Sequence, residues 1–262
     1  MTHHKEARTI DEVIDQLEQL IHECSNTKDR IGYFASLYHK VTVRVKDAIL
    51  KKEFEDNARM EKFDVIFANR YLSALRQWKE NDIPTAPWLV AFNNSKKNSR
   101  LLLQHLLLGM NAHINLDLGI AAVQVIGTQD IRSIHNDFNR INDILGAMTF
   151  EVLQDVNRIS PLLSLFGLHA TNDTILIQFS ITNARDGAWS FAEDLSTKKG
   201  QEFDACILTR SNTIRKLADS LVRPAGLVKI TLGIIHLFEW RNPRKIIQVL
   251  HEHRKTYLSF RD

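Results

Sequence analysis

Four positions spaced by four residues interrupt an otherwise apolar stretch, and their residue types are the ones best suited to chemistry: His105, Gly109, His113 and Asp117. An α-helix turns by about 100° per residue, so side chains four apart lie on nearly the same side. His113 and Asp117 are one turn apart, about 6 Å along the axis, and can hold one ion together. His105 lies about 12 Å from His113, which suits a supporting role, and Gly109 leaves room for a neighbouring helix or ligand.

A metal site needs at least one more ligand than this pair supplies. The break at Gly127 makes the following helix an antiparallel neighbour of the apolar one, and counting back from the break places Asp137 opposite Asp117. We therefore nominate His113, Asp117 and Asp137 as metal ligands, and a mixture of imidazole and carboxylate suits Zn, Fe or Mn better than Ca. In this scheme Asp137 also serves as a catalytic base, and Arg185 holds an anionic group of the substrate.

The same residues also have a purely structural interpretation. Buried polar groups must find hydrogen-bond partners, so the histidines can bond backbone carbonyls and Asp117 can bond an arginine or a helix end. Arg185 and Trp189 are four residues apart and can form a structural cation–π contact. The other residues that we assign to the surroundings of the pair are His105, Gly109, Asn111 and Asn142.

The elements that position these side chains follow from the spacing of apolar residues. Hydrophobic residues make up 44% of the 262-residue chain and charged residues 25%, with only 5 prolines and 10 glycines, which favours long helices over a turn-rich β fold. Residues 173–181 have strand propensity, but because the sequence offers no second strand to pair with them we predict helix there. We expect an all-α fold, one domain spanning 1–262, in which about ten helices surround a central apolar helix at about 100–125. Besides the central one, the longer predicted helices cover residues 10–21, 29–54, 56–78, 129–145, 183–195, 201–221, 224–238 and 243–257.

Charge and composition narrow the classes of partner. The net charge of +3 is far from that of a dedicated nucleic-acid binder, so we expect no specific nucleic-acid binding. We expect a cytoplasmic protein, because the chain shows no apolar leader and no disulfide framework. We also expect no transmembrane segment, since the apolar run at 227–237 is shorter than the roughly 20 residues that span a bilayer. Basic residues at 241–255 on an amphipathic helix suit acidic lipid or a partner protein, although such a face is more often simply solvated.

Residues 109–118, which read GMNAHINLDL, resemble the motif G-x-N-A-H-I-x-x-D-L of an uncharacterised bacterial family, a domain of unknown function. The likeness extends to D-F-x-x-x-N-x-x-L at residues 137–145, to R-x-x-A-W at 185–189, and to a segment with Asp64, Arg70, Ala74 and Trp78. It thus covers most of the chain. The resemblance implies one shared helical fold and a bacterial origin, and it implies no activity.

Two classes of function stay open at this point. The first is a metal-dependent hydrolase acting on a phosphoester or another ester, in which the metal held by His113, Asp117 and Asp137 lowers the pKa of a bound water. The second is a non-catalytic helical module that binds a small-molecule ligand or a partner, with the polar stripe as a buried hydrogen-bond network. The residues alone leave open whether the protein is an enzyme.

Overall fold

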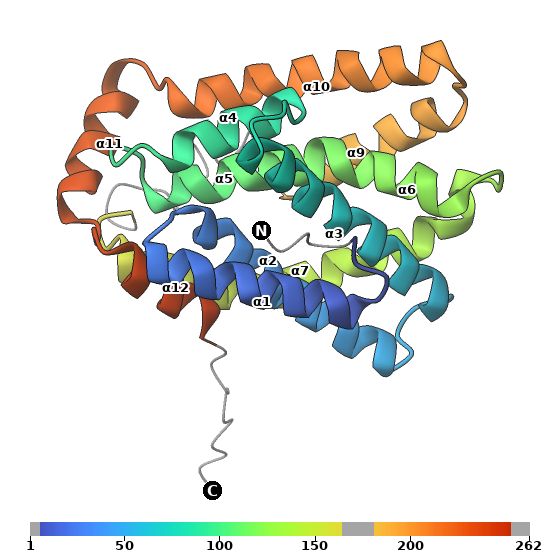
Figure 1. Ribbon diagram of the computed structural model, residues 1–262, viewed down its shortest axis with the longest axis horizontal. Helices are drawn as coiled ribbons and strands as arrows, with labels where there is room; N and C mark the ends of the chain where they lie inside the picture. Colours follow the sequence, from blue (N-terminus) through green and yellow to red (C-terminus); the bar gives the residue numbers. More distant parts are fainter. Residues whose placement is uncertain (1–5, 164–180, 253–262) are drawn as a thin grey trace, which may run out of the picture.

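The computed structural model describes residues 6–163 and 181–252, and this part of the chain is helical almost throughout and contains no strand (Figure 1). The all-α bundle predicted from the sequence is confirmed, while most of the helix predicted at 173–181 lies outside the described residues. The helices are α1 (Ile10–Thr27), α2 (Ile31–Leu50), α3 (Asn57–Lys79), α4 (Ala86–Ser95), α5 (Leu102–Ala112), α6 (Leu118–Ile126), α7 (His135–Ile159), α9 (Ile181–Ser196), α10 (Gln201–Val222), α11 (Gly226–Phe238) and α12 (Pro243–His251).

The apolar helix predicted at the centre is present and runs unbroken from Leu102 to Ile126. It consists of α5, a π-helical segment (His113–Asp117) and α6, and it lies between α10 and α1 in Figure 1. By length and composition this helix could cross a membrane, but 83% of its most apolar window is buried inside the protein. The bent pair of α10 and α11, with 65° between the two helices, also passes that test when taken together. Burial on most sides explains why the central helix is apolar almost all round.

Local capping explains several of the helix boundaries. The hydroxyl of Thr9 accepts a hydrogen bond from the backbone N–H of Glu12 at 3.2 Å, which makes Thr9 the N-cap of α1. Asn242 caps α12 in the same way through the backbone N–H of Lys245, and Pro243 occupies the first turn, where its missing N–H costs nothing. Threonine and asparagine are both residue types that favour the N-cap position.

α7 is longer than predicted. We expected this helix to end near residue 145, before Gly146, yet it continues to Ile159. A glycine inside a helix costs only about 1 kcal/mol, and burial of Met148, Val156 and Ile159 in the second half outweighs that cost. The ammonium of Lys40 on α2 also lies 3.0 Å from the carboxylate of Asp155, so a buried ion pair holds this half of α7 to the core.

Candidate functional site

The stretch from His113 to Asp117 interrupts the α-helical hydrogen bonding of the central helix. Here the backbone N–H of Leu118 donates to the carbonyl of His113, five residues earlier, so the segment is π-helical. Such segments are rare inside α-helices and occur frequently at functional sites. The two side chains at its ends meet, with Nδ1 of His113 3.4 Å from a carboxylate oxygen of Asp117.

Asp117 is the centre of a buried polar network. Its side chain is 1% exposed and accepts hydrogen bonds from Nε of Arg70 on α3 at 2.9 Å and from Nε1 of Trp88 on α4 at 2.7 Å. Burial by itself raises the pKa of Asp117, but the Arg70 guanidinium, together with the hydrogen bonds from His113 and Trp88, outweighs burial and holds that pKa below its ordinary value. Asp117 is therefore a carboxylate at neutral pH.

His113 is held by aromatic rings on its other sides. Its imidazole stacks on the ring of Phe67 with centroids 3.6 Å apart and meets the ring of Tyr38 edge-on at 4.5 Å. Burial lowers the pKa of His113 more than Asp117 raises it, so the ring is neutral. With the Nδ1 proton assigned toward Asp117, Nε2 is a hydrogen-bond acceptor. It is buried and meets no partner within residues 6–163 and 181–252.

A partly open apolar cavity of about 240 Å³ adjoins His113 and is lined mainly by α2, α5 and α7. Its walls are almost entirely hydrophobic, and His113 and Arg185 are the nitrogen-bearing side chains that line it. Its wall includes Leu37, Val41, Leu106, Met110, Leu145 and Met148.

Arg185, which lines this cavity from α9, is an unusual buried cation. Its side chain donates hydrogen bonds to the amide oxygen of Asn142 and to the carbonyl of Phe138, and its guanidinium lies 4.4 Å from the centre of the Phe138 ring. Only 3% of the residue is exposed, and no carboxylate of the described chain lies within ion-pair distance. Burial lowers its pKa to about 10, which still leaves it charged at neutral pH. The cation–π partner is Phe138; Trp189, which we had paired with Arg185, stacks instead on His135 at 4.4 Å.

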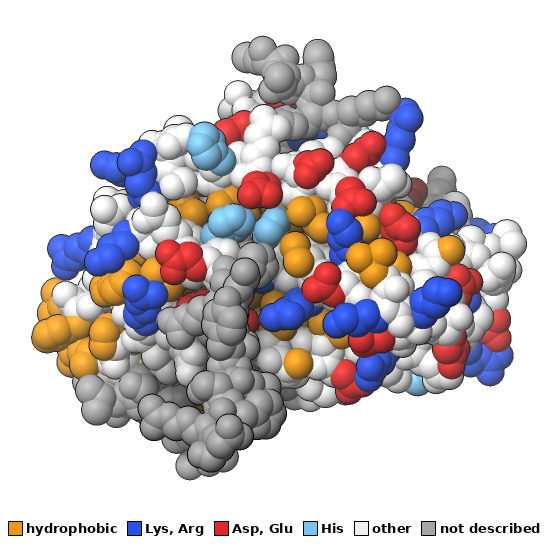
Figure 2. Space-filling view, turned by 90° about the horizontal axis from the view of Figure 1, so that it is seen from below, with side chains coloured by type: hydrophobic (Ala, Val, Ile, Leu, Met, Phe, Trp, Pro, Cys, Tyr) orange, Lys and Arg blue, Asp and Glu red, His pale blue; other side chains and the backbone are white. Residues whose placement is uncertain are grey.

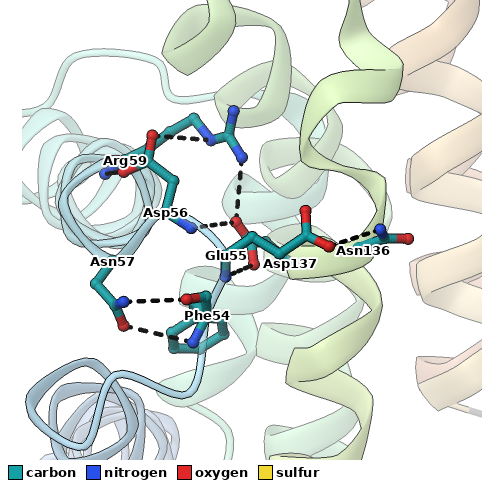
Figure 3. Close-up of polar contacts among 7 residues, drawn as sticks. All are labelled: Phe54, Glu55, Asp56, Asn57, Arg59, Asn136 and Asp137. Carbon is teal, nitrogen blue, oxygen red and sulfur yellow. Dashed lines mark hydrogen bonds and ion pairs between the residues drawn. The ribbon is translucent and has the colours of Figure 1, made fainter.

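Asp137 lies in a different place from the His113–Asp117 pair. It accepts hydrogen bonds from the backbone N–H groups of Glu55 at 2.7 Å and Asp56 at 3.2 Å, and from the guanidinium of Arg59 at 3.1 Å (Figure 3). These contacts tie the first turn of α7 to the loop before α3. Among the described residues no three His, Cys, Asp or Glu side chains gather as a metal site would require, so the ligand set that we nominated is not assembled.

The other residues assigned to the surroundings have structural contacts. His105 meets the ring of Tyr33 at 5.5 Å, and burial lowers its pKa to about 3, so it is neutral. Asn111 donates to the carbonyl of Ile214 at 3.1 Å and thereby joins the central helix to α10. A Cβ added at Gly109 would lie 2.5 Å from the ring of Phe34, so the room made by this glycine is filled by α2.

A polar cleft of about 470 Å³ lies beside the same network, lined in part by Arg70, Trp88 and Asp117. The sequence did not reveal the roles of Arg70 and Trp88. Arg70 was signalled only by its place in the motif-bearing segment of α3, and nothing in the spacing of the sequence pointed to Trp88. The pair therefore has Asp117 at a polar cleft and His113 at an apolar cavity.

Fold and site together define an all-helical protein with a buried His–Asp pair beside an apolar cavity. The chain belongs to a family of unknown function, DUF5995, whose model matches residues 10–224, from α1 to the end of α10. Comparison with curated proteins and with solved structures finds no match for the chain.

Proposed function

We propose that this protein binds a small apolar carboxylic acid in the cavity between α2, α5 and α7. The observation that carries the proposal is Arg185, a buried cation at the cavity wall with no carboxylate of the described residues within ion-pair distance. An unpaired buried charge is costly, and a ligand carboxylate would remove that cost through a charge-assisted hydrogen bond. This gives Arg185 the role of anion anchor that the sequence suggested.

The walls of the cavity favour an apolar ligand body. Apolar cavities of about 150 Å³ stay free of water and bind molecules of the size of benzene. The larger volume of about 240 Å³ accommodates a short aliphatic chain or an aromatic ring with a carboxylate. Burial of such a body contributes about 25 cal/mol per Å² of apolar surface removed from water.

His113 adds a second polar contact. Its Nε2 is an acceptor in an apolar environment and matches a hydroxyl or an amide N–H of the ligand. Asp117 sets the tautomer that leaves Nε2 free to accept, as a carboxylate commonly does for a functional histidine. The site thus selects an acid that also carries a hydrogen-bond donor.

The donor set does not fit the metal-dependent hydrolase considered above. Both oxygens of Asp117 already accept hydrogen bonds, one of them from the cation Arg70, whose charge opposes that of a second cation. Asp137 is likewise occupied by backbone N–H groups and Arg59. Neither carboxylate is therefore free to bind a metal ion.

Calorimetric titration with matched small molecules tests the proposal. Medium-chain and aryl-substituted carboxylates should bind, whereas alcohols and amines of the same carbon skeleton should bind at least about tenfold more weakly, the equivalent of one charged hydrogen bond. Arg185→Gln should remove this preference, and Leu145→Trp should abolish binding by filling the cavity. Leu208→Trp, on the exposed side of α10, is the matched control. Equal affinity for acids and alcohols in a folded protein would overturn the proposal.

A further inference from the structure

α11 presents an apolar surface to solvent. Within this helix only the side chain of Ile235 is buried, whereas Leu227 is 81% exposed, Leu237 66% and Phe238 60%. Figure 2 shows hydrophobic side chains gathered at the end of the molecule where α11 lies in Figure 1. Large apolar patches are uncommon on monomeric soluble proteins and mark sites of interaction with proteins or membranes.

The exposed charges in the stretch of chain that contains this helix have one sign. Between residues 223 and 245 the only acidic residue is Glu239, which is buried, and burial raises its pKa to about 7. The exposed charged side chains of the same stretch are all basic: Arg223, Lys229, Arg241, Arg244 and Lys245. An apolar helix flanked by lysine and arginine is the pattern of a helix that lies in the interface of an anionic membrane.

A pocket of about 210 Å³ adjoins the C-terminal end of α11 and is lined by three arginines, Arg30, Arg100 and Arg241. None of the three makes an ion pair with a described residue. The carboxylate of Glu239, which also lines the pocket, is engaged by the backbone N–H of Leu102 at 2.8 Å and by the hydroxyl of Ser160. Guanidinium groups bind phosphate oxygens in bidentate fashion, so the pocket is suited to a phosphate group.

We propose that α11 and this three-arginine pocket form a docking surface for membranes that contain anionic phospholipid. The apolar side chains of α11 lie among the acyl chains near the interface, and the pocket receives a lipid phosphate. The charge of the surroundings favours this partner over a second copy of the chain, because two copies would bring the same basic residues face to face. The proposal is independent of the ligand in the central cavity.

Vesicle co-sedimentation of the full chain tests it. We expect binding to vesicles of phosphatidylcholine with phosphatidic acid to be at least about 25-fold stronger than to pure phosphatidylcholine vesicles. Each basic residue near an anionic surface contributes about a fivefold factor in partitioning, equal to about 1 kcal/mol, so Arg100→Gln with Arg241→Gln should weaken binding about 25-fold. The triple change Leu227→Ser, Leu237→Ser and Phe238→Ser should abolish it.

Matched controls separate these effects from nonspecific ones. Arg8→Gln with Arg44→Gln removes two exposed arginines elsewhere and should weaken binding far less, while Leu50→Ser and Leu208→Ser remove exposed leucines elsewhere and should leave it intact. The proposal is overturned if the vesicles do not bind, if the α11 variant binds like the wild type, or if that variant converts a dimer to a monomer. Binding of inorganic phosphate without vesicle binding would also overturn it, because the pocket would then serve a free anion.

Discussion

Replacing Asp117 by alanine should destabilise the protein strongly, because this side chain joins three helices. It accepts hydrogen bonds from Arg70 on α3 and Trp88 on α4, and it contacts His113 one turn away. The substitution leaves two buried N–H groups and a guanidinium without their acceptor. Unpaired buried donors cost more than the hydrogen bonds contributed, because the donors lose water as well.

The magnitude follows from the burial of the pair. Breaking a buried ion pair by removing one partner costs about 3–5 kcal/mol. Arg70 is partly exposed at the polar cleft and can recover some hydration there, so we take the lower end, about 3 kcal/mol. For a chain of this size that corresponds to a fall of about 6–12 °C in Tm.

The effect should also depend on pH. Because the folded-state pKa of Asp117 is below its ordinary value, its stabilisation is present above the ordinary pKa of about 4 and is lost as the pH falls through the folded-state value. The difference between wild type and Asp117→Ala should therefore be full at pH 7 and should shrink in acid.

Urea unfolding followed by circular dichroism measures both the loss of stability in Asp117→Ala and its dependence on pH. Asp143→Ala is the matched control, because Asp143 also pairs with an arginine, at 2.7 Å, but on the surface of α7, where loss of the pair should cost less than about 0.5 kcal/mol. A difference below about 1 kcal/mol for Asp117→Ala at pH 7 would refute the view that Asp117 organises the site.

Three further predictions concern other features of the site. Burial raises the pKa of Asp64 to about 7, so its contribution to stability is complete below the ordinary pKa near 4 and is lost as the pH rises through 7. The free energy of unfolding of Asp64→Asn should thus rise by about 2–3 kcal/mol relative to that of the wild type as the pH goes from 5 to 8. A difference between the two proteins that does not change with pH in urea unfolding would contradict this. Gly109→Ala should lower Tm, because the new methyl meets the ring of Phe34, whereas Gly146→Ala, in open space on α7, should raise stability by about 0.5–1 kcal/mol; a gain for both would show that the contact yields freely. Elemental analysis after incubation with Zn, Mn or Fe should find substoichiometric metal; a stoichiometric amount that disappears in His113→Ala would restore the hydrolase hypothesis.

Local patterns predicted the fold and the central pair well, because both depend on residues close together in the sequence. The continuous apolar run indicated a buried helix, and the spacing of His113 and Asp117 brought them together. The π-helical segment was not predicted, because the four-residue spacing of His113 and Asp117 also fits a regular α-helix. The prediction that α7 ends before Gly146 was wrong, because a glycine does not end a helix when the residues on both sides of it are packed against the core.

The position of Asp137 was beyond sequence reasoning for a different reason. Placing it opposite Asp117 required that the helices on either side of Gly127 run along each other. The chain instead makes a 3₁₀ turn at Ile131–Ile134, and the first turn of α7 meets the loop before α3. The angle between two helices depends on the packing of both, which a one-dimensional register does not contain. For the same reason the sequence did not predict the hydrogen bond from Trp88 to Asp117.

Under our proposal the two interpretations of the polar stripe, a structural network and a ligand site, are parts of one arrangement. Arg70 compensates the charge of Asp117 on the side of the polar cleft, while His113 and Arg185 are the nitrogen-bearing side chains that line the apolar cavity. Arg185 is the charged side chain of this lining, and under our proposal its guanidinium favours an acid over an amine or a neutral ligand. In that proposal the network that stabilises the fold also determines which nitrogen of His113 keeps its proton and which one accepts a hydrogen bond from the ligand.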